Sequence, residues 1–201
     1  MNLVTLVQHS TQYYLFDTQQ GKLMFDCGWP GELAHFKEIA RRAGIKLSEI
    51  KLILCSHYHM DHAGLVQDFK NMGATLILME SQIGAPQTLN EYMLKKNIPM
   101  TPIKDEDHVL LKFSESRAWL AKLGLAGEII STPGHGADHV TLILDDGSAF
   151  TGDLPPRFLV TEDQTDAIEA WNRIHEHPIA RIYPSHGPRH EMYPNYNQES
   201  A

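Results

Sequence analysis

The chain has 201 residues, of which 42% are hydrophobic and 21% charged, a balance typical of a folded globular protein and not of a disordered chain. Its formal net charge of -8 at pH 7 argues against tight binding of nucleic acid, which needs clustered Lys and Arg. The sequence has neither the basic start of a signal peptide nor an apolar run near the roughly 20 residues that span a bilayer. We therefore expect a single cytoplasmic domain over residues 1–201 that binds neither nucleic acid nor membranes.

The first half of the chain predicts strands that alternate with helices. Short apolar or alternating runs predict strands at residues 3–7, 13–17, 22–25, 51–55 and 74–78. Helical spacing of apolar residues predicts helices at residues 31–43, which Gly44 ends, and at residues 63–72. A looser helix is expected over residues 81–97, because Gly84 and Pro86 interrupt the pattern.

The second half continues this mixture. Strands are predicted at residues 109–113, 128–132, 140–144, 149–151 and 179–183. Helices are predicted at residues 116–123, with Ser116 near the cap, and at residues 165–177. The chain after Pro188 is polar and is expected to be poorly ordered. Strands and helices in this order indicate a layered α/β or α+β fold.

Histidine and cysteine usage bear on the chemistry. The two cysteines, Cys27 and Cys55, are too few for a disulfide framework and are expected to be buried thiols. Histidine occurs 12 times, and many of these residues fall in short clusters. This content makes a metal or acid–base site the first hypothesis.

A dense group of candidate metal ligands follows the predicted strand at residues 51–55. It reads His57-x-His59-x-Asp61-His62. In an extended segment, residues two apart point the same way, so His57 and His59 can reach one metal ion together. Asp61 and His62 lie where the chain turns into the next predicted helix, and can reach a second position a few ångströms away. Imidazole and carboxylate are the ligands that zinc and similar divalent ions take in open catalytic sites.

Three more segments place one His or Asp beside a glycine at the end of a predicted strand. They are Thr132-Pro133-Gly134-His135, Thr151-Gly152-Asp153 and Pro184-Ser185-His186-Gly187. Glycine lets the backbone turn sharply and lets a ligand approach closely. One such segment alone is more often a turn, but all of them in this order predict a metal centre.

Together these segments resemble the metallo-β-lactamase superfamily, and specifically its glyoxalase II-like ligand set, over nearly the whole chain up to His186. The resemblance implies an αββα sandwich of the α/β (α+β) class, with two mixed β-sheets flanked by helices and the metal ions at one edge. It also implies a dinuclear site. The first ion would be held by His57, His59 and His135, the second by Asp61, His62 and His186, and Asp153 would bridge the two.

His139 lies four residues after His135 and matches the second histidine of the superfamily's Thr-Pro-Gly-His-x-x-Gly-His segment. Asp138 replaces the glycine of that segment. We expect His139 to orient ligands in catalysis without binding metal, and a simple loop hydrogen bond is an equal alternative.

A site of this kind predicts a metal-dependent hydrolase. Two divalent ions about 3.5–4 Å apart can deprotonate a shared water and hold it as a nucleophile near neutral pH. We expect the bridging hydroxide to cleave an ester-type bond (a thioester, lactone or other carboxylic ester), with Asp61 steering the proton. Zinc is the expected ion, and iron and manganese suit the same geometry.

For each of these known activities of the superfamily, this chain is expected to lack a feature of the enzymes that carry it out. Glyoxalase II enzymes carry a further helical domain that grips glutathione, and this chain ends at Ala201, so we expect that domain to be absent. The added domains of the nuclease members are also expected to be absent. Acyl-homoserine lactonases resemble this ligand set but have a tyrosine three residues after the bridging aspartate, where this chain has Pro156.

Two residues are candidate substrate contacts. Arg157 lies four residues after Asp153 and could bind a substrate carboxylate or phosphate, although a salt bridge to Glu162 is the plainer explanation. Tyr58 could line the pocket or pack in the core. The candidate lid or specificity loop is the segment 82–107.

Three other functions remain open at this stage. The chain could be a phosphodiesterase of the same fold, an iron-dependent oxidoreductase similar to the superfamily's persulfide dioxygenases, or a metal-binding protein without catalysis. The persulfide dioxygenases use fewer ligands and one iron, so the complete ligand set favours two metal ions and hydrolysis. We expect a small-molecule substrate, and both a monomer and a homodimer are compatible with the sequence.

Overall fold

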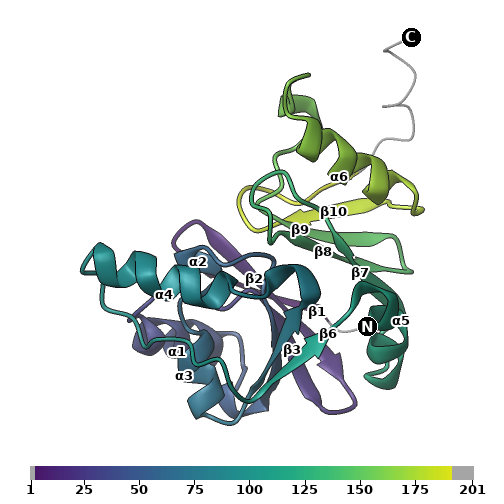
Figure 1. Cartoon of the computed structure of the whole chain (residues 1–201). Coiled ribbons are helices and arrows are strands. Elements are labelled where there is room, and N and C mark those ends of the chain that lie inside the picture. Colours follow the sequence, from purple (N-terminus) through teal and green to yellow (C-terminus); the bar gives the residue numbers. More distant parts are fainter. Residues whose placement is uncertain (1–2, 192–201) are drawn as a thin grey trace.

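The structure, a computed structural model that describes residues 3–191, consists of two mixed β-sheets packed face to face (Figure 1). The first sheet has the order β1-β2-β3-β4-β5-β6, with bounds Leu3–Gln8, Thr11–Thr18, Gly21–Phe25, Ile50–Leu54, Thr75–Met79 and His108–Leu111. The second sheet has the order β11-β10-β9-β8-β7, with bounds, from β7 to β11, Gly127–Ser131, Val140–Leu144, Ser148–Gly152, Arg181–Pro184 and His190–Glu191.

Helices cover the outer face of each sheet. The α-helices α1 to α6 span Leu33–Arg42, Met60–Ala63, Val66–Asn71, Ala85–Lys95, Phe113–Lys122 and Thr165–His175. The short 3-10 helices η1 to η3 span Leu47–Glu49, Glu80–Gln82 and Arg157–Leu159. Helices α1 to α4 lie against the first sheet and α6 against the second (Figure 1). This is the layered α/β (α+β) fold that the sequence pattern predicted, in the αββα arrangement that the resemblance implied.

Strand direction brings several strand ends to the same edge. Strands β1, β2 and β3 pair antiparallel, whereas β3, β4, β5 and β6 run parallel. In the second sheet β9 and β10 are parallel, and the other pairs are antiparallel. Because the carboxyl ends of parallel strands meet at one edge of a sheet, the loops after β3 and β4 lie together, as do those after β9 and β10.

Aromatic side chains fill the space between the two sheets. The ring of Phe150, on β9, lies 4.8 Å from Phe16 and 5.0 Å from Tyr14, both on β2. Tyr183, on β10, stacks on the same ring at 4.6 Å. These contacts join the sheets through a core of buried rings, which fixes the distance between the strand ends above it.

The predicted helix over residues 63–72 is divided into α2 and α3. The N–H of Gly64 donates to the carbonyl of Gly28 at 3.1 Å, and the N–H of Leu65 donates to the carbonyl of Cys27 at 3.2 Å. A Cβ at Gly64 would lie 2.4 Å from the nitrogen of Pro30. Carbonyls of the loop after β3 therefore accept from N–H groups that would donate within a continuous helix. The same loop packs against Gly64 and leaves no space for a side chain there.

The boundaries of α5 also differ from the prediction. Phe113 is the first helical residue and not the end of a strand, because its N–H donates to a carboxylate oxygen of Glu80 at 2.8 Å. Ser116 lies inside the helix and does not cap it. Its hydroxyl accepts a hydrogen bond from the N–H of Ile129 at 3.0 Å and so ties α5 to β7.

Other expectations fall close to the structure. Both cysteines are free and buried. Helix α6 ends at His175 and not at residue 177, and β10 begins at Arg181 and not at residue 179. After Pro188, His190–Glu191 pairs with β10, and the rest of the polar tail lies outside the described residues.

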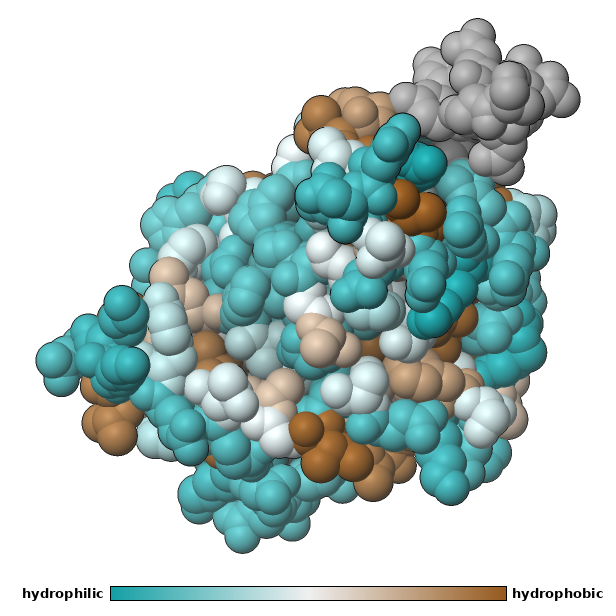
Figure 2. Space-filling view, turned by 45° about the horizontal axis from the view of Figure 1, so that its top comes forward, coloured by the Kyte–Doolittle hydropathy of each residue, from teal (hydrophilic) through white to brown (hydrophobic). Residues whose placement is uncertain are grey.

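The surface seen in Figure 2 is mostly hydrophilic, with apolar residues scattered among polar ones. Among the described residues, no helix has the length and apolarity needed to cross a membrane.

Candidate metal centre

Five histidines and two aspartates predicted as metal ligands converge where the two sheets meet. They lie on the loop and short helix after β4, on the loop after β7, and directly after β9 and β10, and are His57, His59, Asp61, His62, His135, Asp153 and His186. Their ligand atoms form three overlapping groups, each with all its atoms within 4.8 Å of one another. The structure thus brings the residues together, and their role as ligands remains a prediction.

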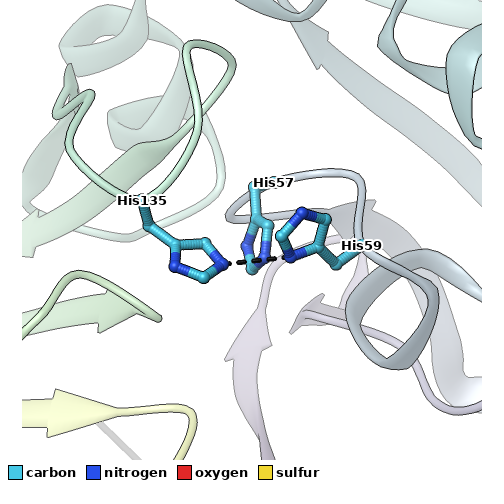
Figure 3. Close-up of side chains that lie close together, drawn as sticks. All are labelled: His57, His59 and His135. Atoms are coloured by element: carbon cyan, nitrogen blue, oxygen red, sulfur yellow. Dashed lines mark hydrogen bonds between the residues drawn. The ribbon is translucent and has the colours of Figure 1, made fainter.

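The first group consists of His57, His59 and His135, whose rings point toward one another from two different loops (Figure 3). Nδ1 of His59 and Nε2 of His135 are 3.0 Å apart. The ring of His57 lies 4.5 Å from that of His59 and 4.7 Å from that of His135. Three nitrogens facing one space are the arrangement that a divalent ion with imidazole ligands requires.

The second group consists of His57, His62 and Asp153, and the third of Asp61, His62 and His186, so both contain His62. Its Nε2 lies 3.3 Å from Oδ2 of Asp61 and 3.3 Å from Oδ2 of Asp153. Nε2 of His186 lies 3.1 Å from Oδ2 of Asp61 and 3.5 Å from Oδ1 of Asp153. Asp153 also approaches the first group, with Oδ2 at 3.6 Å from Nε2 of His135. Asp153 therefore stands between the groups, as a bridging carboxylate would.

Several polar atoms at this place are buried without a hydrogen-bond partner among the described residues. Three of them belong to predicted ligands, namely Nε2 of His57, Nε2 of His62 and Oδ1 of Asp153, and Nε2 of His139 is a further one. Buried polar atoms are almost always hydrogen-bonded, so each such atom needs an explanation. A bound cation would satisfy all three, and His and Asp suit zinc, iron or manganese. The residues present therefore fit divalent metal ions.

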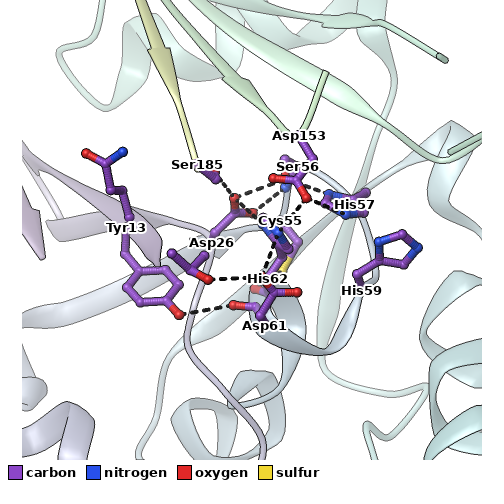
Figure 4. A network of polar contacts seen from close by, with 12 residues as sticks. Tyr13, Asp26, Cys55, Ser56, His57, His59, Asp61, His62, Asp153 and Ser185 are labelled. Carbon is purple, nitrogen blue, oxygen red and sulfur yellow. Dashed lines mark hydrogen bonds and ion pairs between the residues drawn. The ribbon is translucent and has the colours of Figure 1, made fainter. Parts of the chain in front are cut away.

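Asp26 supports the centre, although the sequence reasoning above did not identify it. It follows β3 in a left-handed conformation, with φ of 62°, and is fully buried. Its carboxylate accepts hydrogen bonds from the backbone N–H of Ser56 at 2.7 Å and from the hydroxyl of Ser185 at 2.8 Å (Figure 4). Its Oδ2 also lies 2.8 Å from Nδ1 of His62. The signal was an Asp directly after an apolar strand, the same signal that marked Asp153.

The contact with Asp26 fixes the tautomer of His62. A carboxylate accepts a hydrogen bond from the protonated Nδ1, which leaves Nε2 of the ring directed at Asp61 and Asp153. His57 has a comparable contact, with its Nδ1 at 2.9 Å from the hydroxyl of Ser56. Each of these buried imidazoles is therefore oriented by a contact at Nδ1, the nitrogen that faces away from the other candidate ligands, as is usual for metal-binding histidines.

The charges at the centre perturb its pKa values in opposite directions. Burial, and then the nearby His62, lower the pKa of His57 well below its ordinary value. Burial would also lower the pKa of His62, but the carboxylates of Asp26, Asp153 and Asp61 raise it well above the ordinary value. Burial would raise the pKa of Asp61, and hydrogen bonds from His186 and His62 lower it instead. Asp61 is therefore ionised, as a ligand must be.

Gly152 lets β9 approach the loop after β4. Its φ is +52°, and a Cβ would lie 2.5 Å from Cβ of Ser56 and 2.8 Å from Nε2 of His139. Any side chain here would push Asp153 away from the other ligands.

Asp138, which replaces a glycine of the superfamily's segment, ties two ligand loops together. Its Oδ2 accepts a hydrogen bond from the N–H of Tyr58 at 2.8 Å. Its carbonyl accepts one from the side-chain amide of Gln82 at 3.2 Å. The loop that carries His135 is therefore clamped to the loop that carries His57 and His59.

His139 is fully buried behind the first group, with its ring 5.4 Å from that of His57. Its Nδ1 lies 3.0 Å from the hydroxyl of Thr132. Burial, and then the nearby His135, lower its pKa to about 3. None of the candidate metal groups of the described residues includes His139. Its place suits the orienting role expected of it, which stays a prediction.

The two candidate substrate contacts have different settings. Tyr58 is buried in the core against the first sheet and also lines a groove beside the centre. Arg157 lies half-buried on η3, and its guanidinium makes no ion pair with Glu162 or with any other described residue. Contact of either residue with a substrate stays a prediction.

Two hollows open beside the ligands. One, of about 440 Å³, is mainly apolar and is lined by Tyr58, His59, Met60, Asp61, Thr88, Leu89 and Tyr92. The other, of about 360 Å³, lies between segments 133–137 and 163–167 and includes His135. Helix α4, part of the predicted lid segment, forms one wall of the apolar groove.

The fold and the geometry of this site agree with the comparisons to known proteins. The model of the metallo-beta-lactamase superfamily matches residues 6–186, so the chain belongs to that superfamily. Its members are mostly metal-dependent hydrolases. The chain is 30% identical over 184 residues to the beta-lactamase-like protein 2 homolog of Caenorhabditis elegans, covering 89% of this chain and 56% of that protein. It is 27% identical to the lactamase-like protein adaB of Aspergillus niger, covering 92% and 52%. The chain thus spans about half the length of these relatives.

Solved structures show the same fold at lower identity. The di-iron-bound form of TTHA1623 superposes with a TM-score of 0.69 at 22% identity, covering 95% of this chain and 94% of that one. The metallo-beta-lactamase family protein TTHA1429 of Thermus thermophilus gives a TM-score of 0.69 at 18% identity, covering 94% and 73%.

Proposed function

We propose that the chain is a dinuclear metal-dependent hydrolase that cleaves an ester-type bond of a small molecule. The observation that carries the proposal is the overlap of the three ligand groups. His57 belongs to the first and second groups and His62 to the second and third, so the ligand atoms form one continuous cluster. A cluster of this extent accommodates two neighbouring ions, whereas one ion needs only one group.

In this proposal, the candidate ligands hold two ions. His57, His59 and His135 would hold one ion, Asp61, His62 and His186 the other, and Asp153 would bridge them. When bound, the two ions lower the pKa of a shared water and polarise the bond to be cleaved.

Asp61 has a second task in this proposal. The hydroxyl of Thr11 donates to Oδ2 of Asp61 at 2.9 Å, and the hydroxyl of Tyr13 donates to its carbonyl at 3.1 Å. The first contact holds the carboxylate in one orientation, and the second holds the backbone of the same residue. Because its pKa is lowered, Asp61 is a weak base, and it serves to orient a water and its proton more than to remove that proton.

The apolar groove favours a carboxylic ester or thioester over a phosphodiester. None of its lining residues is Lys or Arg. Tyr58, Met60, Leu89 and Tyr92 instead offer apolar surface to an acyl chain next to His59 and Asp61. A phosphodiester would need compensating positive charge along its path.

The test begins with elemental analysis of protein purified without added metal. Protein samples are then assayed with matched chromogenic carboxylic esters, lactones, thioesters and phosphodiesters. We expect about two divalent ions per chain and turnover of an ester-type substrate. Turnover of phosphodiesters alone would replace the substrate class. A single iron per chain and no hydrolysis would contradict the proposed reaction and favour an iron-dependent oxidoreductase.

Variants connect the activity to the residues. Asp61→Asn and Asp153→Asn should each lower both metal content and turnover, since each removes a charged ligand. Asp105→Asn, at an exposed position away from the centre, serves as the control. Full activity in Asp61→Asn or Asp153→Asn contradicts the proposed roles.

A further inference from the structure

A second cluster of metal-ligand side chains lies outside the centre described above. It consists of His9, in the two-residue turn between β1 and β2, with Glu32 and His35 at the start of α1. One ligand atom from each lies within 4.8 Å of those of the other two. Two imidazoles and one carboxylate are a donor set that zinc takes in proteins.

The distances in this cluster are close to those of a metal site. Oε2 of Glu32 lies 2.8 Å from Nε2 of His9 and 3.3 Å from Nδ1 of His35. Ligand atoms about 2.0–2.1 Å from a tetrahedral zinc stand about 3.3 Å from each other. An ion can therefore enter with small side-chain movements. The side chains of His9, Glu32 and His35 are 49%, 37% and 50% exposed, so an ion can reach them from solvent.

A buried residue supports the carboxylate. The side-chain amide of Gln8, which is fully buried, donates to Oε2 of Glu32 at 2.9 Å. Glu32 occupies the N-cap position of α1, yet its side chain makes no capping hydrogen bond and is directed at the two histidines instead. The carboxylate is therefore held in place from the protein side, as ligating carboxylates usually are.

The backbone at His9 also fixes the cluster. Its φ is 55°, a left-handed conformation that two-residue hairpin turns use and that Gly, Asn, Asp and His adopt more readily than other residues. The pairing of Gln8 with Thr11 closes this turn. The imidazole consequently stands over the start of α1, with its ring edge-on to that of His35 at 5.5 Å.

We propose that His9, Glu32 and His35 bind a further divalent transition-metal ion, zinc by the chemistry of the donor set, separate from the centre that contains His57 and His62. The ion joins the β1–β2 turn to α1. This turn also contacts the centre, because the carbonyl of Ser10 accepts a hydrogen bond from Nδ1 of His186 at 3.0 Å. The proposal rests on the cluster alone and not on the proposed hydrolase function.

Protein stripped of metal is equilibrated with zinc by dialysis, and elemental analysis then counts the bound ions. A competing chelator measures the affinity of each site for zinc. The experiment compares the natural chain, the double variant His9→Ala/His35→Ala, and the single variant Glu32→Gln. The control is His108→Ala/His177→Ala, which removes two half-buried histidines elsewhere. Each protein is also prepared in a His59→Ala/His135→Ala background, which disables the first ligand group, so that failure of the main centre and of this cluster are distinguished.

In each background, we expect the double variant to bind one zinc fewer than the chain in which His9 and His35 are intact. Glu32→Gln should lower the affinity of the cluster for zinc by about tenfold or more while leaving the fold intact. Zinc should raise the Tm of the chain in the His59→Ala/His135→Ala background, and this rise should be smaller when His9 and His35 are also replaced, since each ion that binds only the folded chain stabilises it. Equal zinc counts in the natural chain and the double variant, or an equal loss in the control, overturn the proposal.

Discussion

Asp26 and His62 form a fully buried pair in which a carboxylate oxygen lies 2.8 Å from Nδ1 of the imidazole. The two residues are far apart in the sequence, and they meet because β3 and β4 run parallel as neighbours. The pair orients Nε2 of His62 toward Asp61 and Asp153. The geometry of the candidate metal centre is therefore shaped by a residue that is not among the candidate ligands.

Asp26→Asn tests this dependence. The amide keeps the size of the carboxylate but no longer accepts strongly from Nδ1, so we expect metal affinity to fall by about 10–100-fold with the fold retained. Competition with a chelator measures the affinity, and circular dichroism checks the fold. The matched control is Asp107→Asn, because Asp107 is exposed and has a similar φ of 54°. Equal affinities in the two variants would show that the pair plays no part in metal binding.

Gly152→Ala tests the close approach of β9 to the loop after β4. The new Cβ would overlap Ser56, and we expect a loss of about 1–3 kcal/mol in the free energy of unfolding, together with reduced metal content. Gly44→Ala is the control, since Gly44 also has a positive φ, 75°, but has no atoms within 4 Å of the added Cβ. Urea unfolding of both variants separates the overlap from backbone strain. Equal losses would assign the whole effect to the backbone.

Metal binding should release a proton from His62. Its raised pKa means that the metal-free protein holds a proton on this ring near neutral pH, and a ligand nitrogen must be free of it. Affinity should therefore fall as the pH falls. Isothermal titration calorimetry in buffers of different ionisation enthalpy counts the released protons. A binding enthalpy that does not depend on the buffer would contradict this prediction.

His139 should make the metal-free protein sensitive to acid. Its pKa of about 3 in the folded state lies below the ordinary value of 6.5, so as the pH falls below about 6.5 the unfolded chain takes up the proton first. The stability due to the neutral ring is complete above pH 6.5 and declines as the pH falls toward 3, by at most about 1.4 kcal/mol per pH unit. His139→Gln should flatten this decline in urea unfolding between about pH 7 and 4, and His108→Gln should leave it unchanged. An unchanged slope in His139→Gln would remove His139 as its source.

Arg157→Ala tests the candidate substrate contact. The guanidinium makes no ion pair among the described residues. If it binds a substrate carboxylate, KM for anionic esters should rise by about tenfold, whereas KM for neutral esters should stay constant. Arg41→Ala is the control, because Arg41 is exposed on α1 and paired with Glu38. Parallel changes for both classes of ester would mean that Arg157 does not recognise charge.

The sequence alone determined the residue types of the centre and the class of fold. The spacing of His57 and His59 is a local property of extended backbone, and glycine beside His135 and Asp153 marks strand ends without any knowledge of the partner strands. Apolar periodicity likewise located most strands and helices, since it reflects which face of each element is buried.

Only the tertiary structure decided the contacts between distant segments. The break between α2 and α3 comes from hydrogen bonds to Cys27 and Gly28, and the start of α5 from the carboxylate of Glu80. The pairing of Asp26 with His62 and of His9 with Glu32 arises in the same way. Strand order and packing set which loops meet, and neither is encoded in the local spacing of residues. For that physical reason, the candidate ligands could be predicted from the sequence, whereas the residues that hold those side chains in place could not.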